Sequence, residues 1–418
     1  MIQKLLSWAL WFLVVGIVFM IPELGYLAII PLGVVALGIL LDAPGNVSVE
    51  RVLGKGSVRV GEEVEVKVRA RVASGIGVFL LRQNLPEEFV LVEGSNVGAF
   101  FKGFRPVEVE LSFRVKASRR GRYELPGVEF SGHHLLGLKP SRWGVYGGSK
   151  ELTVMPLVTS PRRVRTPTTK SPIPIPTTSL SVRGSLSTDF REIREYRPGD
   201  PLKFVNWKAS ARKGKAMVNE FEREGKKTVM FYVDARDVMN VGTSVENPFE
   251  YAIQLVSSLS YYFTRRGYNI GLYVIGLDTL LPPATGSKQL YEIVKTLLEL
   301  ENFRAGEESL EEAIGKTKRI LLSYTPLVVY VSNLLERNAG EVKGTVKKLR
   351  AIYKSARLPF LVFDISTYSL LGGGPEKLVR LEKRAIHHEL AGAAYIMPWD
   401  PGKEDVSTIL TKTVRLIR

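Results

Sequence analysis

The sequence predicts a multidomain chain in which a two-helix transmembrane hairpin is followed by a β-sandwich module and an α/β domain. Three observations support this prediction. Two long uncharged runs open the chain, apolar and polar residues then alternate with a period of two, and short apolar runs alternate with helical stretches from residue 228 onward. We place the three parts at 1–42, 46–156 and 189–418, with a linker at 157–188.

Length and composition limit the possible functions. A chain of 418 residues is too long for one ordinary core, so several domains are expected. The net charge of +16 favours an acidic partner, which could be a protein surface, nucleic acid or anionic lipid. The chain has no cysteine, which excludes disulfides, thiol catalysis and cysteine–zinc sites.

The two N-terminal runs predict the transmembrane hairpin. Residues 5–21 and 24–41 carry no charge, and each run is close to the roughly 17–25 residues that a membrane-spanning helix needs. Pro22-Glu23 leaves room only for a tight turn between them. A cleaved signal peptide is the alternative, but no small-residue cleavage site follows the first run.

The charges that flank this hairpin predict its orientation. Lys4 precedes it, basic residues follow it, and the turn carries only Glu23. Because basic residues stay on the cytoplasmic side, we expect a cell-membrane protein with two spans, with both termini and the soluble domains in the cytoplasm.

The next two parts are recognised by patterning. The runs "EEVEVKVRARV" (62–72) and "PVEVELSFRVKA" (106–117) alternate apolar and polar residues, which is typical of half-buried strands and favours a β-sandwich. Residues 159–187 hold five prolines and many Ser and Thr residues. Proline disfavours helix and central strand, so this segment is interpreted as a linker or as a strap over a surface.

The C-terminal half reads as a parallel sheet covered by helices on both faces. The expected strands are "TVMFYVD", "NIGLYVIG", "PLVVYVSN", "PFLVFDI" and "AYIMP", with helical stretches between them. Functional loops are expected at the carboxyl ends of the strands, after Val233, Ile275, Val331 and Phe363.

Two features resemble known families. The strand that ends at Asp234, within this alternating order, resembles the von Willebrand factor A fold. The stretch 194–224 resembles the signature of the domain of unknown function 58 family, with Arg-Glu-Tyr at 194–196, Pro-Gly-Asp at 198–200, Trp-Lys-Ala-Ser-Ala-Arg at 207–212 and an acidic strand at 219–222. That resemblance implies two spans, a β domain, a von Willebrand factor A-like domain and a MoxR-type AAA+ ATPase as partner. The candidate partner-binding or structural residues are Arg194, Tyr196, Gly199, Asp200, Trp207, Lys208, Arg212 and Glu220.

The signature stretch also predicts local structure directly. Pro198-Gly199 suits a type II turn, Asp200 a helix N-cap, Pro201 the first helical position and Gly214 the helix end, so a helix is expected at 201–213. Its apolar stripe would be Leu202, Val205 and Ala209, and Lys203 would lie over the Trp207 ring.

Charge makes this helix a candidate recognition surface. Lys208 and Arg212 would share one face, and residues 156–227 hold sixteen basic against seven acidic residues. Alternatively, Trp207 and Tyr196 anchor the helix to the sheet and the basic residues are only solvated. Nucleic-acid binding is disfavoured because no nucleic-acid-binding module accompanies the motif.

A metal site at Asp234 is not expected. The von Willebrand factor A resemblance implies an Asp-x-Ser-x-Ser motif, whose oxygens suit Mg²⁺. Here Arg236 and Val238 stand in place of both serines, and Asn333 stands where an aspartate would be expected. Only Asp234 remains as a candidate ligand (Thr285 is a weak match for the threonine), and a cation at Arg236 would repel a second one.

No catalytic motif is present. The sequence has no P-loop and no Gly-x-Ser-x-Gly elbow, and the adjacent pairs His133-His134 and His387-His388 cannot share a metal readily. We expect no cofactor and no enzyme activity. The leading hypothesis is a membrane-anchored adaptor that presents its α/β domain to a cytoplasmic protein, with a metal-dependent receptor or enzyme, or an electrostatic tether for nucleic acid or lipid, as alternatives.

Overall fold

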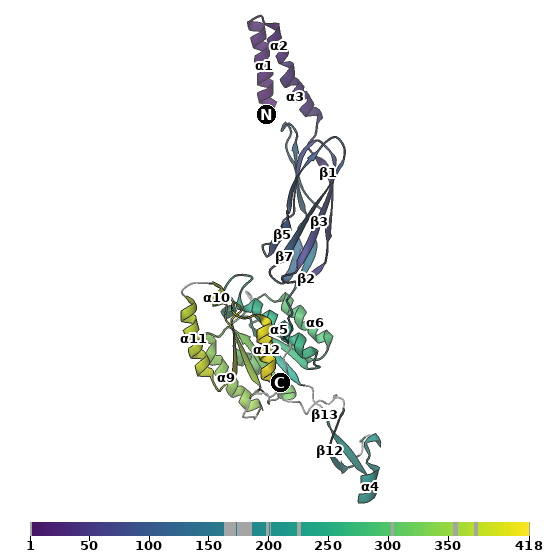
Figure 1. The fold of residues 1–418 in the computed structure, drawn as a ribbon, viewed down its shortest axis with the longest axis vertical. Coiled ribbons are helices and arrows are strands. Elements are labelled where there is room, and N and C mark those ends of the chain that lie inside the picture. Colours follow the sequence, from purple (N-terminus) through teal and green to yellow (C-terminus); the bar gives the residue numbers. More distant parts are fainter. Residues whose placement is uncertain are drawn as a thin grey trace. The chain divides into compact units, whose positions relative to one another are not determined.

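A computed structural model of the chain describes residues 2–162, 173, 186–197, 200, 202–223, 227–301, 305–353, 358–371 and 375–417 (Figure 1). The chain divides into two compact units, Met1–Met155 and Pro156–Arg418. Each unit contains helices and sheets, which confirms a multidomain chain of both element types.

Three apolar helices open the first unit. They are α1 (Ile2–Val18), α2 (Pro22–Leu27) and α3 (Ile29–Leu40), and α1 contacts both of the others. The turn lies at 19–21, earlier than the sequence suggested, because Pro22 takes the first helical position of α2. Proline suits that position, where its missing N–H has no partner to lose. Gly16 allows α1 and α2 to approach closely, since a Cβ on Gly16 would lie 2.8 Å from the Gly25 nitrogen.

One of these segments is long and apolar enough to cross a membrane. Residues Pro22–Leu40 form a run of 19 residues, and only 22% of its most apolar window is buried. A core helix of a soluble protein would be mostly buried, so this exposure favours a lipid environment. α1 is a shorter apolar helix, and the second span stays a prediction.

The rest of the first unit consists of strands around one apolar core. Two four-stranded antiparallel sheets have the orders β1-β3-β7-β5 and β10-β9-β4-β6, and a three-stranded sheet has the order β2-β11-β8. Along β3, valines point into the core and charged residues into solvent, as the alternation in sequence indicates. The core takes side chains from strands of all three sheets. The strands are β1 (Gly45–Leu53), β2 (Ser57–Arg59), β3 (Glu63–Ser74), β4 (Gly77–Arg82), β5 (Phe89–Gly94), β6 (Val97–Lys102), β7 (Val107–Ala117), β8 (Gly121–Leu125), β9 (Val128–His134), β10 (Arg142–Tyr146) and β11 (Lys150–Met155).

The second unit is built on a six-stranded sheet of order β16-β15-β14-β17-β18-β19. Its strands are parallel except β16, which pairs antiparallel with β15. The chain order reverses between β14 and β17. Because these two neighbours are parallel, their carboxyl ends lie side by side. The strands are β14 (Thr228–Asp234), β15 (Asn269–Ile275), β16 (Thr279–Ala284), β17 (Leu327–Ser332), β18 (Phe360–Ile365) and β19 (Tyr395–Trp399).

Helices cover both faces of this sheet (Figure 1). Val229, Phe231 and Val233 of β14 pack in a core with α5 (Pro248–Thr264), α6 (Ser287–Glu299) and α12 (Val406–Ile417). Alternate residues of the same strand, Met230 and Tyr232, pack on the other face. The helices there are α7 (Leu310–Lys316), α8 (Lys318–Tyr324), α9 (Glu336–Tyr353) and α11 (Pro375–Leu390).

Parts of the predicted linker lie against the α/β unit. The Thr159 amide donates to Ser258 of α5, and Arg162 pairs with Asp405 at 3.2 Å. Ile173 is fully buried, and its amide donates to the Leu416 carbonyl. These described residues behave as a strap, while most of 157–188 lies outside the described residues.

Candidate functional site

The signature stretch lies in an antiparallel hairpin. β12 (Leu186–Glu195) pairs with β13 (Met217–Arg223), and their connection carries the short 3-10 turn η1 (Leu202–Phe204) and the helix α4 (Trp207–Lys213) (Figure 1). We call residues 186–223 the arm. Its two strands form a sheet of their own, separate from the six-stranded sheet.

The prediction that Asp200 caps a helix at 201–213 is wrong. Its carboxylate receives two hydrogen bonds from the Arg194 guanidinium, at 2.7 and 2.8 Å, and one from the Arg197 amide at 2.8 Å. Arg194 chiefly, with the Arg197 amide, lowers the pKa of Asp200 to about 2. Asp200 therefore pairs with Arg194 of β12 instead of capping a helix. Tyr196 is half-buried, and its amide donates to the Ala216 carbonyl across the hairpin.

The helix begins at Trp207, and Asn206 is its cap. The Asn206 side chain accepts from the Ala209 amide at 2.9 Å and donates to Asn219 of β13 at 2.8 Å. Ser210 accepts from the Met217 amide, which holds the helix to the same strand. Gly214 ends the helix in the left-handed conformation, φ +65°, as predicted.

One face of α4 is open to solvent. Ala209 and Ser210 are half-buried against the hairpin, while Trp207, Lys208 and Arg212 are exposed. Trp207 is 72% exposed, so it does not anchor the helix to the sheet. Within the described residues, Lys208 and Arg212 form no ion pair. We call Trp207, Lys208 and Arg212 the basic face.

Two further expectations about the arm fail because the helix starts late. Leu202 precedes the helix and is 69% exposed, so it does not belong to a buried stripe. The Lys203 ammonium lies 4.8 Å from the centre of the Phe204 ring, instead of over Trp207. Gly199 lies outside the described residues, and the backbone of Glu220 pairs with Glu192 across the hairpin.

A second group of polar residues lies at the carboxyl ends of β14 and β17. Oδ1 of the fully buried Asp234 accepts from the Arg236 amide and Nε, at 3.0 and 2.9 Å. Oδ2 accepts from Arg236 Nη2, Tyr330 and Ser332 at 2.8–2.9 Å. Both carboxylate oxygens are thus saturated by donors of the chain itself.

Arg236 is held between two acids. Its remaining Nη1 donates to Glu341 of α9 at 2.8 Å, and the other Glu341 oxygen accepts from the Leu310 amide. Burial alone would lower the pKa of Arg236, but the hydrogen bonds to Asp234 and Glu341 raise it above its ordinary value. The guanidinium therefore stays charged and lies against the carboxylate that a metal ion would need. Among the described residues, no group of three His, Asp or Glu side chains is arranged to hold a metal.

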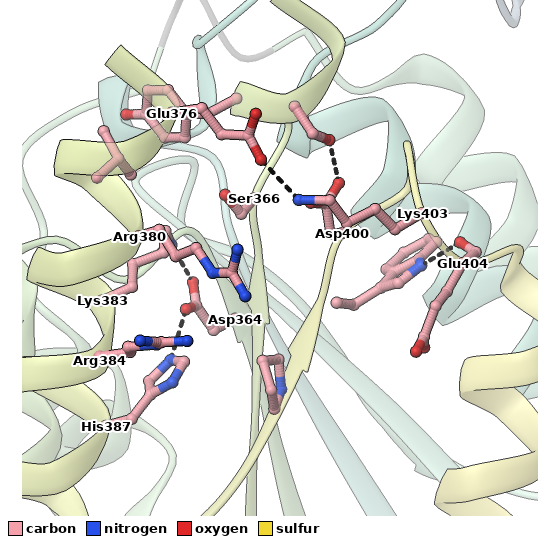
Figure 2. A pocket seen from close by; sticks show the side chains of 15 residues that line it. Asp364, Ser366, Glu376, Arg380, Lys383, Arg384, His387, Asp400, Lys403 and Glu404 are labelled. Atoms are coloured by element: carbon pink, nitrogen blue, oxygen red, sulfur yellow. Dashed lines mark hydrogen bonds and ion pairs between the residues drawn. The ribbon is translucent and has the colours of Figure 1, made fainter. Parts of the chain in front are cut away.

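Sequence reasoning missed a third cluster, at the end of β18. Asp364 is 1% exposed and contacts both Lys383 and His387 of α11, the latter at 2.7 Å (Figure 2). Burial is the largest single influence on the pKa of Asp364 and would raise it, but the charge of Lys383 together with the hydrogen bonds from His387, Lys383 and the Leu334 amide lowers it below its ordinary value. The sequence distinguishes His387 only as one member of the pair His387-His388. In the structure its neighbour His388 is exposed.

The family comparison applies to this second unit. Residues 192–367 match the family model described as Protein of unknown function DUF58. The match begins in β12 and ends just after β18, so it includes the basic face, Asp234 and Asp364. It supports the family part of the resemblance drawn from the sequence, and it does not extend to Met1–Met155.

Other comparisons add no functional information. No curated protein matches the chain. Solved structures similar to it include a non-cellulosomal cohesin from Archaeoglobus fulgidus, at 12% identity and TM-score 0.18, over 26% of this chain and 91% of that one. A family two carbohydrate esterase from Cellvibrio japonicus matches at 9% identity and TM-score 0.22, over 88% of this chain and 98% of that one. At TM-scores this low, neither match supports a conclusion about the fold or function of this chain.

Proposed function

We propose that the chain is a membrane-anchored adaptor whose arm binds an acidic surface of a cytoplasmic protein. The observation that carries this proposal is the basic face: Trp207, Lys208 and Arg212 are exposed together on a helix whose other side is fastened to the hairpin. A surface that is held in place loses little conformational entropy on binding.

The chemistry of the basic face suits a protein partner. Trp and Arg are the side chains that most often dominate the binding energy of interfaces. Lys208 and Arg212 would pair with carboxylates across the interface, and the Trp207 ring would be buried. From the family resemblance, a MoxR-type AAA+ ATPase is the proposed partner.

Features of the α/β unit favour an adaptor over a metal-dependent receptor. Its strand order and the position of Asp234 support a von Willebrand factor A-like, Rossmann-type fold. In this proposal the metal position of that fold is taken by Arg236, whose donors saturate Asp234. The domain would then bind its partner without a bridging metal ion.

The anchor in this proposal is a hairpin of two spans. Pro22–Leu40 would be one span and α1, which packs against it, the other. Large apolar side chains on both segments are exposed, including Trp11, Ile17, Ile30 and Leu40, and lipid would cover them.

Charge reversal on the basic face tests the proposed docking. Lys208→Glu with Arg212→Glu is expected to abolish co-purification of a MoxR-type AAA+ ATPase with the full chain from detergent-solubilised membranes. Like charges would then face each other across the interface. Melting of the protein should hardly change, since both side chains are exposed.

A matched control is available on α9. Lys347→Glu with Arg350→Glu makes the same change in net charge at two exposed positions of the same unit, and it should leave co-purification intact. The docking proposal is wrong if the arm variant folds normally and still retains the ATPase. Binding of DNA or anionic vesicles that is lost in the arm variant alone would favour the tether instead.

The proposed orientation in the membrane gives a separate prediction. With both ends on the cytoplasmic side, a C-terminal tag should survive protease added to intact, right-side-out cells, because the bilayer shields it. The same tag should be cut once the cells are permeabilised with detergent. Cleavage in intact cells would contradict the proposed orientation.

A further inference from the structure

A cavity of about 360 Å³ opens at the carboxyl ends of β18 and β19 (Figure 2). One wall is α11, which contributes Arg380, Lys383, Arg384 and His387, and the opposite wall is the segment 398–404. The carboxyl edge of a sheet of this kind is where ligands commonly bind. The volume lies in the range of small-molecule sites, roughly 300–1,000 Å³.

Most charges around this cavity are paired within the protein. Lys383 pairs with Asp364. Lys403 lies between Glu376 and Asp400, at 2.7 and 3.1 Å. Glu404 pairs with Lys412 at 2.6 Å. These pairs hold both walls of the cavity in place, and few charged side chains remain available to bind a ligand.

Arg380 and Arg384 are the exception. They are one helical turn apart on α11, both are exposed, and within the described residues neither has a hydrogen-bond or ion-pair partner. Figure 2 shows the Arg380 guanidinium directed from α11 into the space facing Asp400, and the dashed lines near the two arginines join Asp364 to Lys383 and to His387. The Ser366 hydroxyl lines the same cavity.

We propose that this cavity binds the phosphate group of a small phosphorylated compound through Arg380 and Arg384. Guanidinium groups match phosphate geometry through two parallel N–H···O bonds each. A phosphate monoester carries nearly two negative charges at neutral pH. These match the two positive charges of the arginines better than the single charge of a carboxylate does. The remaining volume, lined by Val379, Pro398 and Trp399, would accept the rest of the molecule.

This site is independent of the proposed docking function. It uses the carboxyl edge of the sheet and none of the residues of the basic face. Ligand binding there can fail while the arm still binds its partner, and the reverse also holds.

Calorimetric titration of the full chain in detergent micelles tests the proposal, with inorganic phosphate and phenyl phosphate as probes at constant ionic strength. We expect saturable binding of both, with phenyl phosphate tighter because its ring fills the apolar part of the cavity. Arg380→Gln and Arg384→Gln should each weaken binding about tenfold or more, and the double variant should abolish it.

Lys377→Gln serves as the control, because Lys377 is an exposed cation on the same helix that does not line the cavity. It should bind both probes as the unaltered protein does. Circular dichroism should show that the arginine variants remain folded. The proposal is overturned if no saturable binding is found, if the double variant binds as well as the control, or if succinate binds as tightly as phosphate. Weaker binding of phenyl phosphate than of phosphate would overturn the assignment of a phosphate ester.

Discussion

Replacing Arg236 with alanine is expected to lower the free energy of unfolding of the α/β unit by about 3–5 kcal/mol, because it leaves a buried carboxylate without its counter-charge. Asp234 is fully buried, and Arg236 supplies three of the donors that saturate its oxygens. The amide of residue 236 remains in the variant, but both guanidinium bonds are lost. Glu341 loses its ion pair with Arg236 at the same time and keeps only the hydrogen bond from the Leu310 amide.

Amide hydrogen exchange along β14 and β17 in the full chain measures this loss locally. Exchange should accelerate by roughly 10²–10⁴-fold, since each 1.4 kcal/mol is a factor of ten. Adding Asp234→Asn to Arg236→Ala should recover part of the loss, because the uncompensated charge is then gone. Arg265→Ala, at an exposed arginine of the same unit, is the control and should change stability by no more than about 0.5 kcal/mol. A loss at Arg236 no larger than this control would contradict the role assigned to the pair.

Replacing Lys383 with methionine should destabilise the unit by a similar amount at neutral pH, about 3–5 kcal/mol. Asp364 is 1% exposed, and Lys383 also donates to the Asn333 side chain at 2.8 Å. Exchange of the β18 amides reports the effect. Lys383→Met with Asp364→Asn should be more stable than the single variant, since the asparagine oxygen can still accept from the Leu334 amide.

The Lys383 variant should also reverse the pH dependence contributed by Asp364. In the unaltered protein the pKa of Asp364 is lowered, so its contribution to stability is present above the unfolded value of about 3.9 and is lost as the pH falls below it. Without Lys383, burial dominates and raises this pKa, so the folded state binds a proton more readily than the unfolded state. The destabilisation should therefore be smaller at about pH 5 than at neutral pH. An equal loss at both values would show that Asp364 does not carry it.

How much the sequence could predict is clearest in the arm. Gly214 ended the expected helix correctly, because a left-handed helix end depends on one residue. The start was misplaced, because Asp200 and Asn206 are both good caps, and tertiary pairing decides between them. Arg194 engages Asp200, and Asn219 engages Asn206. Neither pairing can be seen before the hairpin is known.

The α/β unit shows the same division between local and tertiary information. Its buried strands could be predicted from their apolar runs. β16 was not predicted, because the two prolines in "TLLPPA" argue against a strand. Arg236 was noticed as a residue that would repel a metal ion. Its contact with Glu341 joins residues 105 positions apart, and the pairing of Asp364 with Lys383 also depends on the folded sheet.

Both outermost strands of the six-stranded sheet contain proline. β16 carries Pro282 and Pro283, and β19 carries Pro398. A strand added from another molecule needs a row of free N–H donors, and proline interrupts that row. The sheet is therefore poorly suited to growth at either end, either by self-assembly into longer sheets or by capture of an extended peptide. In the membrane-anchored protein that we propose, neighbouring copies could therefore meet without joining their sheets.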